Sequence, residues 1–313
     1  MSSDPALTNR RQRRLTVVAI ALLGTVFVLS RGGVRAAWEE IAAFISLTGA
    51  PEPASANLLS EHEIEALDGM PPQNQAELLL ERAINHSRGA NDEIAARVGG
   101  WSGRIELNER LDSLFRTAIN SDDLRVRAAA IEINLVGRHR EKSTATMDGL
   151  EPLARDGEQG PRANALWDIA LLGNRGVDPG RAALILLASL HDDNVNVRYW
   201  AVEGLAHLGT DVTIEPLLQT FHDDPSPMIR ERAACSLSQS GMLSEKQRRT
   251  AVPRLLDFAA DETLDAETRK WVFQALRDIT GQSLGQDTGA WRDWYNSGDV
   301  RWAPVTRDSE SSR

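Results

Sequence analysis

The sequence predicts an all-α protein: an α-solenoid of helix pairs, preceded by a single N-terminal transmembrane helix. Leucine and alanine dominate the chain, only 5% of it is aromatic and runs of β-branched residues are few, which favours helices over strands. The C-terminal two thirds repeats one short pattern at a nearly constant spacing. An uncharged apolar run follows a cluster of arginines near the N-terminus.

The N-terminal residues are typical of a membrane-targeting segment. Four arginines between residues 10 and 14 precede an uncharged run at 15–30. At about 1.5 Å per residue the run extends roughly 24 Å, so crossing a hydrocarbon core of roughly 30 Å needs local thinning or snorkelling arginines. No A-x-A-like cleavage site follows the run, which favours an uncleaved signal anchor over a cleaved signal peptide or a buried soluble helix.

The arginines also predict a topology. Four lie before the run, whereas only Arg31 and Arg35 follow it, so we expect residues 1–14 to be a basic cytoplasmic N-terminus. Residues 15–30 would be the anchor of a single-pass membrane protein, and the solenoid would lie on the extracytoplasmic (periplasmic) side.

A stalk and linker at 31–60 separates the anchor from the solenoid. Residues 36–48 place Trp38, Ile41 and Ile45 on one helical face, as in an interfacial or stalk helix. Two prolines among small residues at 49–60 are typical of a linker, so we expect the domain boundary there.

The repeat is an arginine followed by a glycine ten to twelve residues later. The five arginines are 35, 36, 32 and 39 residues apart, a period that indicates a solenoid. Small residues, mostly alanine, stand three positions after each arginine, where they would let neighbouring helices approach closely. The pairs are Arg127 with Gly137, Arg162 with Gly173, Arg198 with Gly209, Arg230 with Gly241, and Arg269 with Gly281.

Each unit is predicted to be two helices joined by turns. Paired aspartates before the arginine, as at 122–123, 192–193 and 223–224, would cap the second helix, and the glycine would supply a left-handed C-cap. Amphipathic stretches such as 179–192 and 213–224 lie between successive units and would form the first helices.

This pattern of aspartate, Val-Arg or Ile-Arg, alanine, leucine and glycine resembles the HEAT repeat family, especially the short repeats of phycocyanobilin lyases. The resemblance covers about residues 105–281 and is clear in "LRVRAAAIEINLVG", "VNVRYWAVEGLAHLG" and "PMIRERAACSLSQSG". The second unit lacks the acidic pair, and the last has valine in place of alanine. The resemblance implies a right-handed solenoid in which the repeat arginines and aspartates link adjacent repeats.

We place the solenoid at residues 61–302. A helical pair ahead of the array would cap its first repeat, and Trp291, Trp294 and Tyr295 at helical spacing would cover its last one. A stacking platform for a ligand is the alternative role for these aromatic residues. Residues 303–313 have the composition of a disordered tail.

We find no motif that carries catalysis. There is no glycine-rich phosphate loop and no nucleophile elbow, and the single cysteine, Cys235, sits in a predicted helix interior as a packed thiol. "HDD" recurs at 191–193 and 222–224 and could bind a metal, but shared turn chemistry explains both copies. We therefore expect no enzyme activity, catalytic residue, metal or cofactor.

Charge argues against nucleic acid as a partner. The whole chain carries a net charge of −10, and residues 1–35 contribute +5 from six arginines and Asp4, which leaves −15 for the remainder. Such a body repels phosphate backbones.

The candidate binding residues are aromatic. In the HEAT-like class the second helices line the concave surface, so Trp167, Tyr199, Trp200 and Trp271, with Glu203 as a rim acid, would contact a protein partner. The competing interpretation is that these rings fill gaps between repeats. We expect a membrane-anchored scaffold or adaptor that binds a protein through its concave face. The alternative is an enzyme or enzyme subunit of the phycobilin-lyase-like class that handles a chromophore or cofactor.

Overall fold

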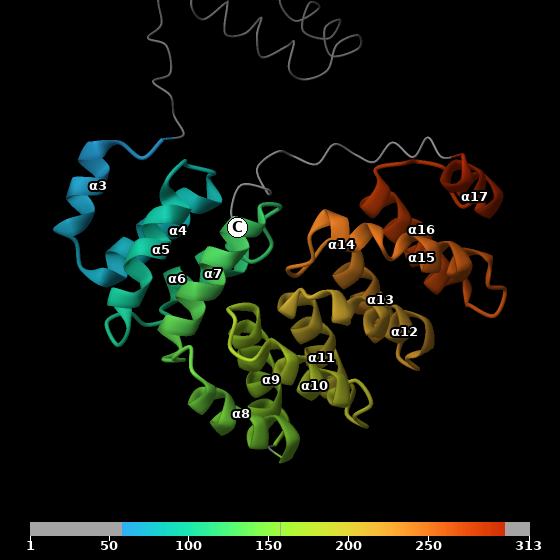
Figure 1. Ribbon diagram of the computed structural model, residues 1–313, viewed down its shortest axis with the longest axis horizontal. Helices are drawn as coiled ribbons and strands as arrows, with labels where there is room; N and C mark the ends of the chain where they lie inside the picture. The colour runs from blue at the N-terminus through green and yellow to red at the C-terminus, as the bar shows by residue number, and fades with distance from the viewer. Residues whose placement is uncertain (1–57, 157, 298–313) are drawn as a thin grey trace, which may run out of the picture. The chain divides into compact units, whose positions relative to one another are not determined.

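The computed structural model describes residues 58–156 and 158–297, and helices make up the regular structure of this part of the chain (Figure 1). Within these ranges there is no strand, and Leu58 and Arg88 form only an isolated bridge. The predicted all-α fold is therefore confirmed there. The predicted anchor, most of the stalk and the C-terminal tail lie outside the described residues.

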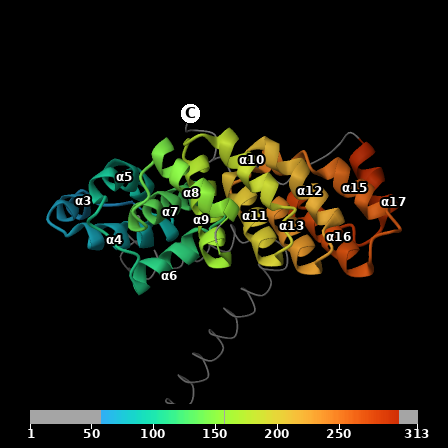
Figure 2. The ribbon, with the colours of Figure 1, turned by 90° about the horizontal axis from the view of Figure 1, so that it is seen from below.

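Most helices occur in pairs, and the second helix of each pair carries the repeat arginine. The pairs follow one another along an arc with the second helices on its inner side (Figure 1), and they form two layers when seen from below (Figure 2). This is the arrangement of an α-solenoid. The pairs are α6 (Glu109–Ala118) with α7 (Leu124–Gly137), α8 (Thr144–Asp156) with α9 (Gln159–Asn174), α10 (Pro179–Ser189) with α11 (Val195–Leu208), α12 (Ile214–Asp223) with α13 (Pro227–Ser238), and α15 (Val252–Ala260) with α16 (Ala266–Thr280).

Helices outside these five pairs complete the array. Near the C-terminal end, α17 covers the last pair: the Trp291 indole is fully buried and donates to the Gly285 carbonyl at 3.0 Å, as expected of a covering helix. These helices are α3 (Glu61–Asp68), α4 (Pro72–Ile84), α5 (Ala90–Arg97), η1 (Val98–Trp101), η2 (Asp211–Thr213), α14 (Glu245–Arg249) and α17 (Thr288–Asn296).

The expected single-pass membrane localisation is corrected. Between residues 58 and 297, residue 157 aside, no helix combines the length and the apolar character that a bilayer crossing requires. The run at 15–30, on which the expectation was based, lies outside the described residues. A membrane anchor is therefore not part of the function proposed below.

Repeat arginines link adjacent repeats, as the family resemblance implied. Arg198 donates to the Asp224 carboxylate from Nε at 2.8 Å and from Nη2 at 3.2 Å, and also to the Asp192 carbonyl before its own helix at 2.9 Å. Arg162 pairs with Asp192, and Arg230 donates to Asp265 at 2.8 Å. Each pair joins a second helix to the turn of the next repeat.

The first two repeats are linked differently. Asp168 of α9 is fully buried and accepts from the Nε of Arg138 at 2.8 Å and from the Nε of Arg140 at 2.6 Å. Both arginines lie just after α7, so a buried carboxylate joins α9 to the end of α7.

The caps agree only in part with the predicted ones. Asp123 caps α7, but Asn194 and Ser226 occupy the N-caps of α11 and α13. Asp192 lies two residues before Asn194, and Asp224 lies two residues before Ser226. Each aspartate accepts a hydrogen bond from the backbone N–H of the residue at the N-cap, at 2.8 Å. Because Asn194 and Ser226, not the aspartates, occupy the N-cap positions, these aspartates are available to the repeat arginines.

The repeat glycines serve two purposes. Gly209 and Gly281 have φ of +65° and +70° and end α11 and α16 as left-handed caps. Gly137 and Gly173 instead lie in the last turns of α7 and α9, where an added Cβ would be 2.9 Å from the Leu107 side chain and 2.7 Å from that of Ala182, respectively. Close approach between helices, not backbone conformation, explains those two.

Candidate protein-binding surface

Aromatic side chains from neighbouring second helices meet on the inner side of the arc. Trp167 of α9 contacts Trp200 of α11 edge to face, with ring centroids 5.9 Å apart, and Trp200 contacts Tyr199 at 5.8 Å. Phe115 of α6 lies on the other side of Trp167 at 6.4 Å. All three rings of Trp167, Tyr199 and Trp200 are half-buried, so each keeps part of its surface open to a partner.

Small residues bring the helices of this cluster together. A Cβ on Gly204 of α11 would lie 2.4 Å from the Leu186 side chain and 3.4 Å from the Ala170 Cβ. Ala201 is fully buried three positions after the repeat arginine, as predicted. Because α11 sits so close to α9, the rings at Trp167 and Trp200 come into contact.

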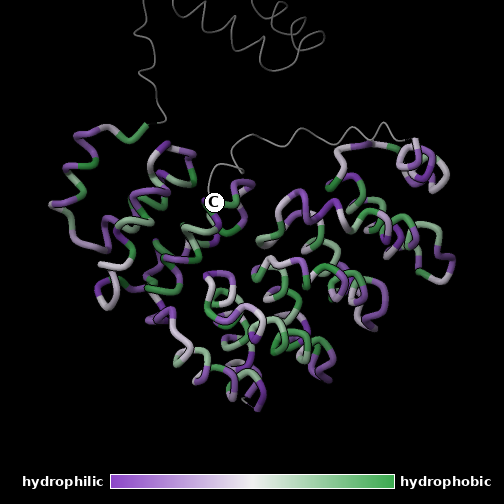
Figure 3. Tube along the Cα trace, in the orientation of Figure 1, coloured by the Kyte–Doolittle hydropathy of each residue, from purple (hydrophilic) through white to green (hydrophobic). Residues whose placement is uncertain are grey.

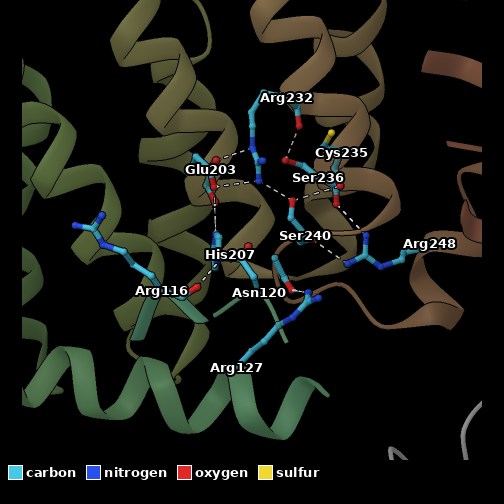
Figure 4. A network of polar contacts seen from close by, with 11 residues as sticks. Arg116, Asn120, Arg127, Glu203, His207, Arg232, Cys235, Ser236, Ser240 and Arg248 are labelled. Atoms are coloured by element: carbon cyan, nitrogen blue, oxygen red, sulfur yellow. Dashed lines mark hydrogen bonds and ion pairs between the residues drawn. The ribbon is translucent and has the colours of Figure 1, made fainter. Parts of the chain in front are cut away.

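Glu203 lies beneath the rings and is engaged by α13. Its side chain is 10% exposed and forms an ion pair with Arg232, with Nε and Oε1 2.5 Å apart. Burial raises the pKa of Glu203, although the charge of Arg232 and a hydrogen bond with Tyr199 oppose that rise. Arg232 also donates to the Ser240 hydroxyl at 2.6 Å, so its guanidinium joins Glu203 to the chain that follows α13 (Figure 4).

His207 completes the support under Trp167. Its ring packs edge to face against the indole at 4.7 Å, and its Nδ1 lies 2.9 Å from the Glu203 carbonyl oxygen. Burial lowers the pKa of His207 to about 4, so the ring is neutral at pH 7. Since a carbonyl only accepts, Nδ1 carries the proton and the tautomer is set by this bond.

Two buried arginines border the network and are paired with carbonyl oxygens. Arg127 of α7 donates to the carbonyls of Ser121, Gln239 and Gly241, the last 114 positions away in the chain. Arg248 of α14 donates to three carbonyls between Ser236 and Leu243 at 2.8 to 3.1 Å. Figure 4 shows both guanidinium groups directed at the chain that follows α13. Burial lowers the pKa of both groups, that of Arg248 to about 10.

The structure brings four of the five predicted contact residues together. Trp167, Tyr199, Trp200 and Glu203 form one cluster, with Glu203 below the aromatic rings and not at their rim. Trp271 lies on α16, half-buried against the core, and makes no ring contact with the cluster. Sequence reasoning expected Arg127 to link adjacent repeats and gave no role to Arg232 or Arg248, because the partners of these arginines are backbone carbonyls or residues about 30 or more positions away.

Side chains able to carry chemistry, namely Cys235, its neighbour Ser236 and the histidine of the second HDD stretch, are buried, half-buried or bonded to other protein groups. Ser236 is buried and donates to the Arg232 carbonyl at 2.9 Å. Cys235 is half-buried, and burial raises the pKa of its thiol. Across the described part of the chain, no three histidine, cysteine, aspartate or glutamate side chains converge as a metal site would require. His222 instead bonds Asp223 at 2.5 Å and Asp261 at 2.9 Å.

The comparisons agree with the helix pairs. A family model described as HEAT repeats matches residues 147–238, which run from α8 to α13. The matched range contains Trp167, Tyr199 and Trp200, whereas Phe115 lies before it. No curated protein matches the chain. The match and the stacked helix pairs together support a HEAT-repeat protein, a helical scaffold of a kind capable of binding other proteins.

Proposed function

We propose that the chain is a scaffold that binds a protein partner through the inner face of its second helices, with Trp167, Tyr199 and Trp200 as the central contacts. The supporting observation is that three large rings from two adjacent helices remain half-buried although they touch one another. Tryptophan and tyrosine at the centre of such a surface are the residues that most often dominate binding energy.

The network below the rings supports the same proposal. Arg232 forms an ion pair with the Glu203 carboxylate at 2.5 Å and His207 donates to the Glu203 carbonyl at 2.9 Å, so the rings rest on a layer whose geometry is already set. A partner would then meet a preorganised surface, which lowers the entropy lost on binding. Trp271, further along on α16, would contact a partner that extends past the cluster.

The test is affinity capture with the tagged full chain from its native cells, followed by crosslinking. Trp200→Ala should weaken binding of one stoichiometric protein partner by about thirtyfold, the loss that corresponds to a hot-spot truncation of about 2 kcal/mol. The control is Leu184→Ala on α10, which truncates a side chain that is 70% exposed outside the inner face. Urea unfolding of both variants separates lost binding from lost folding.

Equal binding by the two variants would refute the proposal. A chromophore or metal that copurifies in place of a protein would favour the alternative enzyme function.

A further inference from the structure

Two grooves lie side by side on helices away from the aromatic cluster. The first, of about 560 Å³, lies between α10 and α12, and the second, of about 510 Å³, lies between α12 and α15. Gln219 and Asp223 of α12 line both, so this helix is their common wall. Figure 2 shows α10, α12 and α15 in succession along one layer. We call these two cavities the outer grooves.

The outer grooves are strongly acidic. Seven carboxylates line them, against two guanidinium groups. Arg198 neutralises Asp224 at 2.8 Å, and Arg254 is 3.6 Å from Glu215. Arginines outside the grooves pair with Asp192 and Asp257. Asp193 is exposed and forms no ion pair with any described residue, whereas Asp223 and Asp261 share the single ring of His222, with the Asp223 side chain 60% exposed. Negative charge therefore remains at Asp193 on one side of α12 and at the Asp223–Asp261 pair on the other.

Apolar side chains line the same grooves. Leu187, Leu190 and Pro216 line the first groove. In the second groove, the Arg254 guanidinium already lies 5.4 Å from the centroid of the Phe258 ring. Carboxylates beside apolar walls suit a guanidinium on an aliphatic stem, because the stem packs while the planar head forms hydrogen bonds.

We propose that the outer grooves bind an extended basic segment of a partner protein, with one arginine in each groove. Charge complementarity selects the occupant, since an acidic or phosphate-bearing ligand would be repelled. Packed helices are about 8–10 Å apart, and a chain in the extended polyproline II conformation advances about 3.1 Å per residue with three residues per turn, so side chains three positions apart leave the same face of the chain and span α12. The partner therefore carries arginines three positions apart.

Fluorescence anisotropy with the full chain tests this proposal directly. The probe is a fluorescein-labelled synthetic peptide, kept extended by prolines, whose two arginines are three positions apart. A second peptide of the same composition has the two arginines adjacent. The spaced peptide should bind about tenfold more tightly, because only it can fill both grooves, and its affinity should fall at high salt.

Variants locate the site. Asp193→Asn with Asp223→Asn should weaken the spaced peptide about three- to tenfold, as expected for two exposed charge contacts. Glu65→Gln with Glu109→Gln removes the same charge from exposed positions on α3 and α6 and should leave the affinity unchanged. Trp200→Ala should also leave it unchanged, which separates this site from the inner face.

Three results would overturn the proposal: no binding of the spaced peptide, equal affinity for the two peptides, or equal losses in the two double variants. Either of the last two results would mean that the peptide is held by non-specific attraction to an acidic protein and not by the outer grooves.

Discussion

Replacing Gly241 by alanine should be among the most damaging single-methyl additions in this chain. The residue follows α13 with φ of +77°, and an added Cβ would lie 2.3 Å from the carbonyl oxygen of Ala206 and 2.5 Å from its carbonyl carbon. Both are backbone atoms of α11, so no side chain can rotate away. The whole turn after α13 would have to move.

The magnitude follows from three contributions. A left-handed conformation costs an L-residue about 1–2 kcal/mol, and overpacking in a rigid environment costs about 1–3 kcal/mol. Moving the turn also breaks the bond from the Met242 N–H to the Ala206 carbonyl, 2.7 Å long, and the one from Arg127 to Gly241. Since these contributions overlap, we expect a total loss of about 3–5 kcal/mol.

Two other glycines separate the contributions. Gly285 has φ of +66° with nothing within 4 Å of an added Cβ, so Gly285→Ala should show the backbone cost alone, about 1–2 kcal/mol. Gly99 has open space and no positive φ, so Gly99→Ala should be nearly neutral.

Urea unfolding, followed by circular dichroism and tryptophan fluorescence, gives the free energies where the two probes coincide. A Gly241→Ala variant no less stable than Gly285→Ala would refute the close-approach reasoning.

Three further predictions concern buried polar groups. Arg127→Ala should cost about 2–4 kcal/mol by leaving three carbonyls without their donor, and hydrogen exchange should accelerate at residues 239–242 more than elsewhere. Asp168→Ala should cost about 2–4 kcal/mol in urea unfolding, below the usual value for a broken buried pair, because its two arginine partners remain partly exposed; a loss under 1 kcal/mol would contradict this. NMR titration should find the pKa of His207 near 4 and that of His222 above 6.5, since burial would lower the latter but bonds to Asp223 and Asp261 outweigh it. The contribution of His207 to the free energy of unfolding should therefore fall as the pH falls from about 6.5 toward 4. The contribution of His222 should be fully present below pH 6.5 and should be lost as the pH rises through the folded pKa of His222. His207→Gln and His222→Gln should each remove the corresponding slope, and unchanged slopes would contradict the assignment.

The repeat was readable from the sequence because local physics produces it. Helix propensity, the spacing of arginine and glycine, and buried alanines such as Ala201 act within one unit or between neighbours, so one pattern recurs at each turn of the array. The contact between Trp167 and Trp200 followed from the same register: they lie five and two positions after their repeat arginines, one helical turn apart on the same helical face, so stacking of α9 and α11 brings the rings together. The expected membrane localisation was based on a single apolar run at residues 15–30, which occurs once and is not part of the repeat.

Only the tertiary structure decided what those side chains rest on. Arg127 has the same repeat position as Arg198, yet it donates to carbonyls more than 110 residues away, whereas Arg198 pairs with the acid of the next repeat. Nor does any spacing reveal that Glu203 is buried under the rings, or that α12 separates two acidic grooves. The curvature of the array sets these contacts, and curvature accumulates from small offsets between packed helices that no single repeat encodes.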